Sequence, residues 1–323
     1  MEKGIMSEKV VFLDQSTLGD ISLEKFKQIG DVVVFDKTAP NLTQARIADA
    51  TIIVTNKVVI TKEMMQSASS LKMICVAATG VNNIDLSAAS ELGICVANVA
   101  GYSTESVVSQ TFSLYFALAH NSAYYDDYAK NSWKKSPIFT HFTPEFSELS
   151  GKKWGIIGLG TIGKRVAAIA TAFGCEVSYM STSGKNHNDT YAEKKLDDLL
   201  SDSDIVSIHA PLNSDTQNLI NLENLSRMKT DAFILNLGRG GIINEKDLAT
   251  ALDNSMIKGA GVDVLSAEPP LATQPLLNLQ AKNSLILSPH IAWAGLEARV
   301  RLVEEIYQNI IAFGRDEKRN VVN

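Results

Sequence analysis

A glycine-rich stretch in the middle of the chain has the spacing of a phosphate-binding turn. Its residues are Gly158, Leu159, Gly160, Thr161, Ile162 and Gly163. An apolar, strand-like run (153–157) precedes it and a helix-like run (164–173) follows it. In that context the first glycine permits a tight turn, the second lets the backbone approach a pyrophosphate, and the third allows a helix to pack closely on a strand. Because the start of the helix offers free N–H groups to phosphates, the sequence predicts a dinucleotide site here rather than a glycine-rich turn without a ligand.

The next expected strand, 176–180, ends without an acidic residue. NAD-selective sites usually carry Asp or Glu at this point, where it binds the ribose 2′-hydroxyl. This chain has Ser181, Thr182 and Ser183, and Lys185 follows two residues later. No carboxylate would repel a 2′-phosphate, and the hydroxyls and the ammonium group are suited to bind one. The cofactor is therefore expected to be NAD or NADP, with NADPH accepted, although a solvated loop that discriminates little fits the residues equally well.

Three polar segments each follow an expected strand farther along the chain. Arg239 lies in segment 236–241, Asp263 and Glu268 lie in segment 261–270, and His290 lies in segment 288–293. Ligands of open α/β sheets bind beyond the carboxyl ends of the strands, so we expect these segments to converge beside the phosphate turn. Taken singly, each residue has a structural alternative, as a turn arginine, a loop-capping carboxylate or a packed histidine.

The composition argues against several classes of protein. The chain has 323 residues, 45% hydrophobic and 20% charged, which suits about two domains of roughly 100–200 residues. A net charge of −6 argues against a nucleic-acid partner. The three cysteines, Cys75, Cys95 and Cys175, lack the spacing of a disulfide framework or a metal site, so buried thiols, no metal and a cytoplasmic location are expected. The amino terminus predicts no signal peptide, and the longest uncharged stretch, 106–125, predicts a buried helix rather than a membrane span.

Short apolar runs alternate with helical patterns along the chain. The expected strands are 10–13, 32–35, 52–55, 73–77 and 94–97, followed by 154–157, 176–179, 205–208, 233–236, 261–264 and 285–287. Near-continuous apolar strands separated by helices are typical of parallel sheets that are covered on both faces. The predicted fold class is α/β, with two doubly wound, Rossmann-like parallel-sheet domains and an interdomain cleft.

The two sets of strands predict the domain boundaries. Residues 1–100 and 291–323 are expected to form a substrate (catalytic) domain, and residues 101–290 an NAD(P)-binding domain, with hinges near Tyr102 and Ile291. Segment 131–150 has two prolines, several aromatic residues and no clean period, so it predicts an irregular connector that could embrace a second copy in a homodimer. A final helix at 296–313 has apolar residues at helical spacing and is expected to pack on the first domain.

Several motifs, in this order, resemble those of the D-isomer-specific 2-hydroxyacid dehydrogenase family, and together they cover nearly the whole chain. The motifs are Ala77–Asp85, Gly101–Ser106, Gly158–Gly163, His209–Leu212, Asn236–Gly241, Gly261–Pro270 and Pro289–Trp293. The first two most resemble the glycerate dehydrogenase/hydroxypyruvate reductase branch. The resemblance implies hydride transfer between NAD(P)H and a small 2-keto or D-2-hydroxy acid.

The same resemblance gives the polar segments their expected roles. Arg239 would bind the substrate carboxylate and polarise the keto oxygen, and its planar guanidinium suits a carboxylate better than a lysine would. His290 would be the general acid/base. Glu268 would be the carboxylate bonded to that histidine, and it would favour the protonated imidazole. Asp263 would lie near the nicotinamide amide.

Further contact residues are implied in the same way. The backbone of Thr79, Gly80 and Val81 would bind the substrate carboxylate as an anion-binding nest, together with Arg239 and His290. Thr104 would contact the nicotinamide side. The adenine pocket would be walled by His209, Ala210 and Pro211, with the His209 ring itself structural. Leu237 and Gly238 would complete the cofactor contacts.

The expected reaction is reduction of hydroxypyruvate or glyoxylate, with oxidation of D-glycerate as its reverse. A D-lactate-type dehydrogenase that uses pyruvate is the nearest alternative. A nucleotide-sensing scaffold, similar to the corepressors that share this fold, is the alternative from outside the enzymes. Phosphoglycerate oxidation is disfavoured because no regulatory domain follows, and formate oxidation because the formate branch lacks the carboxylate that Glu268 supplies.

Overall fold

The computed structural model describes residues 8–323, which fall into two units. The first comprises, within the described residues, 8–103 and Ala294–Asn323, and the second comprises Thr104–Trp293. The boundaries expected from the sequence lie three residues from these (103 − 100 and 293 − 290). Residues 1–7 belong to the stretch in which the sequence predicts no signal peptide, and they lie outside the described residues.

The first unit is built on a five-stranded parallel sheet with the order β2-β1-β3-β4-β5. Its strands are β1 (Glu8–Phe12), β2 (Gly30–Val34), β3 (Ile52–Thr55), β4 (Met73–Val76) and β5 (Cys95–Ala97). Its helices are α1 (Pro40–Ile47), α2 (Lys62–Ser67), α3 (Leu86–Glu91) and α10 (Leu296–Gly314), with short 3-10 turns at Gln15–Thr17 and Glu24–Gln28. Polar caps fix two of the helix starts: Thr61 accepts a hydrogen bond from the Met64 N–H, and Asp85 accepts one from the Ala88 N–H.

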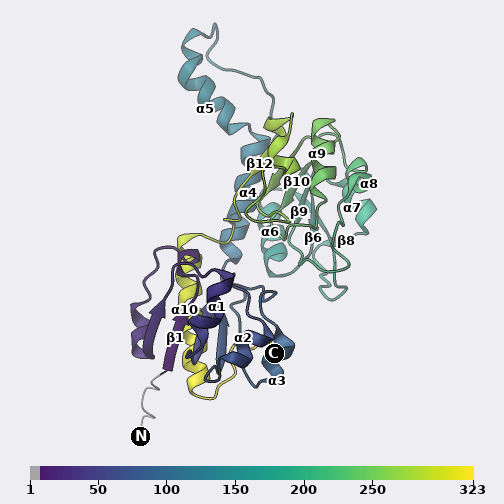
Figure 1. The fold of residues 1–323 in the computed structure, drawn as a ribbon. Helices are drawn as coiled ribbons and strands as arrows, with labels where there is room; N and C mark the ends of the chain where they lie inside the picture. Colours follow the sequence, from purple (N-terminus) through teal and green to yellow (C-terminus); the bar gives the residue numbers. More distant parts are fainter. Residues whose placement is uncertain (1–7) are drawn as a thin grey trace. The chain divides into compact units, whose positions relative to one another are not determined.

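The last helix, α10, belongs to the first unit although it follows the second unit in the chain. Asn309 Nδ2 donates to the Asn98 carbonyl at 2.9 Å, and the rings of Tyr307 and Phe26 meet edge to face with centroids 5.5 Å apart. Figure 1 shows α10, in yellow, beside the sheet of this unit. The chain therefore returns to complete the first unit.

The second unit contains a seven-stranded parallel sheet with the order β12-β11-β10-β9-β6-β7-β8. Its strands are β6 (Lys153–Ile157), β7 (Glu176–Met180), β8 (Ala192–Glu193), β9 (Ile205–Ile208), β10 (Phe233–Asn236), β11 (Gly259–Val262) and β12 (Leu285–Leu287). The sequence did not predict β8, which has two exposed residues and no apolar run.

Helices cover both faces of this sheet, and neighbouring strand residues pack into different cores. Ile156 packs in a core with α4 (Thr104–Ala119) and α6 (Thr161–Ala172). Ile157 packs in the opposite core, with α7 (Leu196–Asp202), α8 (Leu222–Ser226) and α9 (Glu245–Asp253). Both faces are buried, which explains why the strands read as nearly continuous apolar runs. The predicted fold class of two parallel α/β sheets is confirmed.

One segment of the second unit extends away from its sheet (Figure 1). It consists of helix α5 (Ser122–Asn131), a 3-10 turn at Trp133–Lys135 and the following chain to residue 148, and we call residues 122–148 the aromatic arm. The sequence predicted only an irregular connector from 131 onward and missed α5. None of the ten residues of α5 is buried, so the helix lacks the apolar stripe that a periodic pattern would show.

Two expectations drawn from the sequence can be compared with the structure: the burial of the cysteines and whether any helix could span a membrane. All three cysteines are free thiols; Cys75 and Cys175 are buried, whereas Cys95 is only partly buried and corrects the expectation for that residue. Among residues 8–323, no helix combines the length and the apolar character needed to cross a membrane.

Candidate active site

The expected site segments of the second unit all lie at the carboxyl edge of its sheet. Strands β6, β9, β10, β11 and β12 are parallel neighbours, so the loops that follow them share one edge. These loops carry, in turn, the glycine-rich turn, His209–Pro211, Leu237–Arg239, Asp263–Glu268 and His290. The topology thus gathers segments that are up to 132 residues apart in the chain (290 − 158).

The glycine-rich turn has the local geometry that a pyrophosphate needs. Gly158 has a φ of +93°, a left-handed conformation that side-chain-bearing residues rarely adopt. A Cβ on Gly163 would lie 2.2 Å from the Gly158 carbonyl oxygen, so only glycine lets α6 start this close to β6. A Cβ on Gly160, by contrast, would meet no protein atom within 4 Å. The backbone at Gly160, the N-cap of α6, therefore faces open space that a phosphate can approach.

Glycines also bring the neighbouring loops into contact. A Cβ on Gly158 would lie 2.9 Å from the backbone nitrogen of Ala210, and one on Gly238 would lie 2.8 Å from the Ala210 carbonyl oxygen. A Cβ on Gly240 would lie 2.0 Å from the carbonyl carbon of Leu265. The loops after β6, β9, β10 and β11 therefore pack backbone against backbone. Gly240 was not among the expected site residues, although the Gly-Gly pair after Arg239 indicates such a close approach.

His290 and Glu268 form a direct hydrogen bond. Nδ1 of His290 lies 2.6 Å from Oε2 of Glu268, and the two side chains are 26% and 33% exposed. The other carboxylate oxygen, Oε1, accepts the backbone N–H of Leu265 at 2.8 Å. Because the bond occupies Nδ1, the Nε2 atom of the ring is the one placed to exchange a proton with a ligand.

The backbone of His290 is held in an uncommon conformation by Asp263. His290 has a φ of +54°, and its N–H donates to the Asp263 carbonyl at 2.9 Å. The buried Asp263 carboxylate accepts the N–H groups of Ile291 and Ala292, each at 3.0 Å, and the hydroxyl of Ser288. Asp263 therefore fixes the loop that presents the imidazole, while its expected contact with the nicotinamide amide stays a prediction.

Arg239 lies in the neighbouring loop with its charge unpaired. Its Nη1 donates to the Gly238 carbonyl at 2.8 Å, and the Asn236 amide donates to the Arg239 carbonyl at 3.0 Å, which fixes the turn. Across residues 8–323, no Asp or Glu side chain forms an ion pair with this guanidinium. A half-buried guanidinium without a protein carboxylate is suited to bind one from a ligand.

Buried polar atoms that lack a hydrogen-bond partner indicate whether a dinucleotide fits the carboxyl edge of this sheet. Within the part of the chain that the structure describes, Ser181 Oγ at the end of β7 and both ring nitrogens of His209 at the end of β9 are buried without a hydrogen-bond partner. Such atoms each cost about 1–3 kcal/mol when left unsatisfied. They flank the Gly158 turn, where an adenosine ribose and its phosphates would supply hydrogen-bonding groups. The residues therefore fit an NAD(P) cofactor.

The His209 ring, which was expected to be structural, has no hydrogen-bond partner among the described residues. Burial lowers the pKa of its imidazole from 6.5 to about 3, so the ring is neutral at pH 7. A neutral imidazole still has one donor and one acceptor to offer a ligand. Beside Ser181, Thr182 is half-buried and Lys185 is exposed.

The expected substrate residues Thr79, Gly80 and Val81 lie in the first unit, in the loop after β4. The Thr79 hydroxyl donates to the Val99 carbonyl at 3.0 Å, and the Asn98 amide donates to the Thr79 carbonyl at 2.7 Å. These bonds fix the loop against the end of β5. Thr104, the expected nicotinamide contact, is the first residue of α4 in the second unit.

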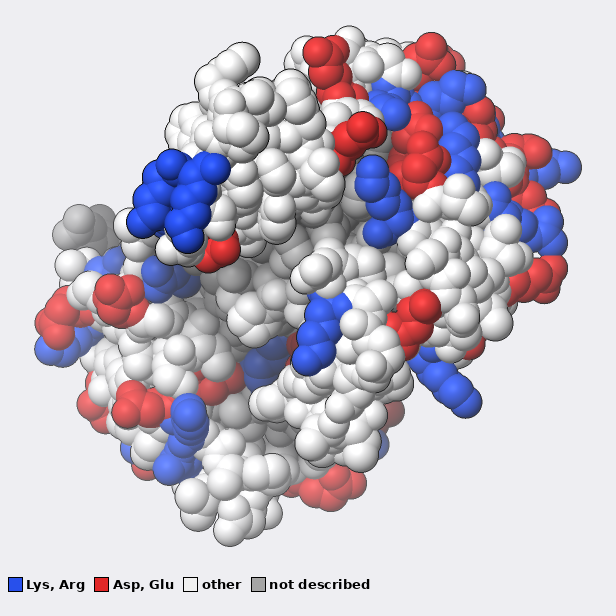
Figure 2. All heavy atoms as spheres, turned by 90° about the horizontal axis from the view of Figure 1, so that it is seen from above, with Lys and Arg blue, Asp and Glu red and all other residues white. Residues whose placement is uncertain are grey.

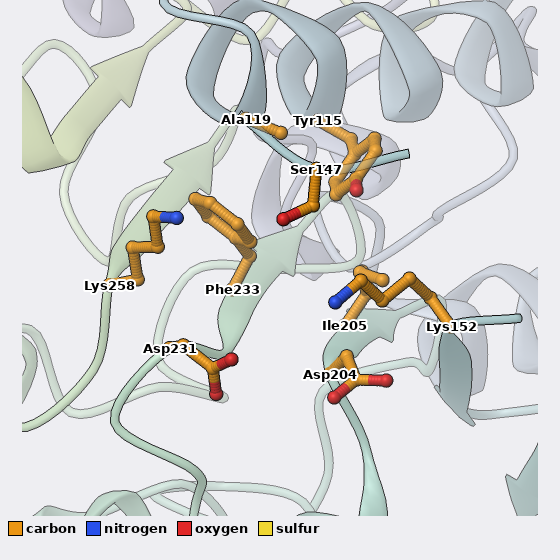
Figure 3. A pocket seen from close by; sticks show the side chains of 9 residues that line it. All are labelled: Tyr115, Ala119, Ser147, Lys152, Asp204, Ile205, Asp231, Phe233 and Lys258. Carbon is orange, nitrogen blue, oxygen red and sulfur yellow. The ribbon is translucent and has the colours of Figure 1, made fainter. Parts of the chain in front are cut away.

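A small cavity lies at the other edge of the second-unit sheet and does not serve this site. Its volume is about 30 Å³, and its lining includes Tyr115, Asp204 at the start of β9 and Phe233 at the start of β10 (Figure 3). Burial raises the pKa of Tyr115 to about 12. The space holds little more than a water molecule.

Charges are mixed on the surface of the molecule. On the face that Figure 2 shows, Lys and Arg side chains alternate with Asp and Glu, and neither sign forms a continuous field across that face.

Comparisons with known proteins agree with this geometry. The model of the D-isomer specific 2-hydroxyacid dehydrogenase, NAD binding domain, matches residues 112–292, more than half of the chain. The hydroxypyruvate reductase of Blautia hydrogenotrophica is 36% identical over 325 residues, which cover 98% of this chain and 99% of that protein. The glycerate dehydrogenase of Methylorubrum extorquens is 35% identical over 322 residues, with 98% and 99% covered.

A solved structure is similar over the same length. The acyclic imino acid reductase Bsp5, in complex with NADPH and D-Arg, has a TM-score of 0.86 and 31% identity, and the match covers 98% of this chain and 100% of that one. The residues matched by the family model include the glycine-rich turn, Arg239, Glu268 and His290. The chain therefore belongs to the D-isomer-specific 2-hydroxyacid dehydrogenase family and is an NAD(P)-dependent oxidoreductase of small 2-hydroxy acids.

Proposed function

We propose that this enzyme reduces hydroxypyruvate and glyoxylate and oxidises D-glycerate in the reverse direction. The observation that carries the chemistry is the 2.6 Å bond between His290 and Glu268, on the same sheet edge as the glycine-rich turn and the carboxylate-free Arg239. Relatives named hydroxypyruvate reductase and glycerate dehydrogenase, which match along almost their full length, support this choice of substrate.

Each of the three side chains has a distinct task in this proposal. The nicotinamide supplies or accepts the hydride at the substrate C2 when it is bound. Arg239 binds the substrate carboxylate through its planar guanidinium and draws electron density toward the keto oxygen. His290 gives a proton from Nε2 to that oxygen during reduction and takes it back during oxidation. Glu268 keeps the ring oriented through its bond to Nδ1.

Steady-state kinetics on a substrate panel test the proposal. The panel contains hydroxypyruvate, glyoxylate and pyruvate, each with NADH and with NADPH. We expect kcat/KM for hydroxypyruvate to exceed that for pyruvate by about 10-fold or more, since the added hydroxyl bonded in a site is worth at least that factor. Glyoxylate, which lacks the methyl group of pyruvate, should be reduced as well. A preference for pyruvate would contradict the substrate and favour the D-lactate-type alternative.

Two further arms separate the remaining alternatives. Cofactor binding without turnover of any member of the panel would favour the nucleotide-sensing scaffold. Because one structural relative is an imino acid reductase, the panel is repeated with pyruvate and glyoxylate in the presence of methylamine, from which imines form. Turnover that requires the amine would overturn the assignment to 2-keto acids.

For the cofactor, we propose that NADPH is accepted as well as NADH. Ser181, directly after β7, has a buried hydroxyl without a partner among the described residues, and no Asp or Glu occurs in 181–188. Ser181→Asp should weaken NADPH binding by about 10-fold or more, because a carboxylate there repels the 2′-phosphate, while NADH binding changes little. Fluorescence titration of both cofactors measures this. A wild-type enzyme with a large NADH preference would contradict the proposal.

We also propose that the backbone of Thr79, Gly80 and Val81 receives the substrate carboxylate. The hydrogen bonds of Thr79 to Val99 and of Asn98 to Thr79 support it, because they fix the loop without involving the backbone of Gly80. Gly80→Val should raise KM for the keto acid and leave the cofactor Kd unchanged. An unchanged KM would remove this loop from the substrate site.

The enzyme is proposed to be a homodimer that associates through the aromatic arm. Six large apolar side chains of the arm are 45–87% exposed: Tyr124, Trp133, Ile138, Phe139, Phe142 and Phe146. Soluble monomers rarely expose so many together. Phe139→Ser with Phe142→Ser should convert a dimer to a monomer in light scattering at micromolar concentration, whereas Leu271→Ser, 71% exposed outside the arm, should not. A monomeric wild type would contradict the proposal.

A cytoplasmic location is proposed on the basis of the thiols. All three cysteines are free, and burial raises the pKa of the Cys75 and Cys175 thiols. Unpaired thiols are typical of a reducing compartment. Fractionation of cells that produce the tagged protein tests this, and recovery from an oxidising compartment would contradict it.

A further inference from the structure

A carboxylate outside the expected site, Glu245, binds the loop that carries Glu268. Glu245 is the first residue of α9, directly after the N-cap Asn244. Its Oε1 accepts the Ser266 N–H at 2.6 Å, and its Oε2 accepts the Ser266 hydroxyl at 2.8 Å and the Gln274 amide at 2.6 Å. Asn244 already caps α9, because its side chain accepts the Asp247 N–H. The three hydrogen bonds of Glu245 are therefore more than the start of the helix requires.

The bonds lead from Glu245 to the imidazole in a short sequence of contacts. Ser266, which Glu245 holds, follows Leu265, whose N–H donates to Glu268 Oε1 at 2.8 Å. Glu268 Oε2 then lies 2.6 Å from His290 Nδ1. The backbone of the same loop, at Leu265 and Ser266, also packs closely against Gly240. The segment that orients the imidazole is thus held by contacts with both Gly240 and Glu245.

This loop needs an anchor because it has little apolar packing of its own. Ser266, Ala267 and Glu268 are all exposed, and Leu265 is only half-buried. An exposed loop without buried side chains is held mainly by hydrogen bonds and by its neighbours. Charge-assisted bonds to a carboxylate are the stronger kind of such bonds. Loss of Glu245 should therefore free Glu268 more than it disturbs the fold.

We propose that Glu245 is a positioning residue, which acts on the reaction by holding the 265–268 loop so that Glu268 stays bonded to His290. It touches neither substrate nor cofactor. The inference rests on the proposed acid/base role of His290 with Glu268, and it adds the residue that keeps that pair assembled.

The main test is a double-mutant cycle in kcat. Glu245→Gln keeps the shape but loses the second acceptor oxygen, and it should lower kcat by about 10-fold while KM and the NADPH Kd stay within about 2-fold. In a Glu268→Gln background the same change should cost less than about 2-fold, because residues in one hydrogen-bond network are not additive. Equal losses in both backgrounds would show that Glu245 acts independently of Glu268 and would overturn the proposal.

Three controls make the outcome decisive. Glu223→Gln removes a first-turn carboxylate from α8 that bonds Arg227 on the surface, and it should leave kcat unchanged. Ser266→Ala removes only the hydroxyl contact with Glu245 and should lower kcat less than Glu245→Gln does. This variant keeps the proposal testable if Glu245→Gln folds poorly. If Glu268→Gln itself left kcat intact, the role of Glu268 in the proposed function would fail. If kcat fell in Glu268→Gln but not in Glu245→Gln, only the positioning role of Glu245 would be overturned.

A second readout does not depend on turnover. Hydrogen exchange measured by mass spectrometry should show the amides of 265–268 exchanging about 5-fold faster or more in Glu245→Gln than in the wild type, while the rest of α9 is unchanged. Unchanged exchange in the loop would contradict the proposal even if the enzyme were inactive on every substrate tried.

Discussion

At the scale of single residues, the imidazole of His290 depends on its backbone as much as on its ring. A φ of +54° is uncommon for a residue with a side chain, and histidine and asparagine tolerate it better than alanine does. The conformation is held by the bonds from Ser288, Ile291 and Ala292 to the Asp263 carboxylate. Strain kept in place by surrounding bonds is a frequent property of catalytic loops.

His290→Ala should lower kcat by about 10²–10⁴, the usual contribution of a positioned acid/base, while NADPH still binds. Kinetics and fluorescence titration measure the two quantities. His290→Asn is the matched control for the backbone, because asparagine keeps the left-handed conformation but cannot protonate. If the Asn variant retained most of the activity, the proton transfer assigned to His290 would be wrong.

Arg239→Lys should reduce kcat/KM for the keto acid by on the order of 2–4 kcal/mol of transition-state stabilisation. A lysine keeps the charge but loses the planar pair of donors that a carboxylate accepts. The cofactor Kd should change little, since Asn236 bonds both the Gly238 N–H and the Arg239 carbonyl and keeps the turn in place when the guanidinium bond to Gly238 is lost. Wild-type kcat/KM in this variant would exclude Arg239 from the substrate site.

At the scale of elements, a methyl group added at either of two glycines in the turn between β6 and α6 should have different effects. Gly160→Ala meets no protein atom, so Tm should be nearly unchanged, but cofactor binding should weaken by about 10-fold or more because the methyl group occupies the side that a phosphate approaches. Gly163→Ala meets the Gly158 carbonyl and should cost about 1–3 kcal/mol of stability as well. Tm by calorimetry and Kd by titration distinguish them, and equal Tm losses would contradict the interpretation.

The strands were the elements that the sequence predicted best. β3, β9, β10 and β12 have the expected bounds, because short, nearly continuous apolar runs are typical of strands in covered parallel sheets. The two-residue β8 and the helix α5 were missed, since neither buries an apolar face that a periodic pattern could reveal.

The candidate site was predictable in part. The resemblance identified Arg239, Glu268 and His290 and implied the bond between Glu268 and His290, which the structure contains. The contacts of Glu245 and Gly240 with 265–266 were not predicted, because they are tertiary and depend on loop conformations that no single-residue preference specifies. The His209 ring was expected to be structural, and its missing partners became visible only in the folded chain.

At the scale of the whole molecule, the buried neutral His209 should make stability depend on pH. Its pKa is about 3 when folded, compared with 6.5 for an ordinary histidine. Below pH 6.5 the unfolded chain therefore takes up a proton that the folded chain does not, so stability present above pH 6.5 is lost as pH falls toward 3. Between pH 7 and pH 5 this amounts to up to about 2 kcal/mol.

Urea unfolding of the cofactor-free enzyme at pH 7 and pH 5 measures the effect. His209→Asn should lose less stability over that interval than the wild type does. His187→Asn is the control, because the His187 side chain is 74% exposed and its loss should not alter the pH dependence. Identical pH dependence in wild type and His209→Asn would show that the ring is not buried in its neutral form.

The backbone contacts at Gly158, Gly238 and Gly240 leave no spare volume where these loops of the second unit meet. Any substitution there that adds even one carbon must displace main-chain atoms, so directed evolution of substrate range should rarely succeed at these positions. Productive changes should concentrate instead in the loop of Thr79 and Val81, where altered selectivity need not disturb the machinery for hydride and proton exchange.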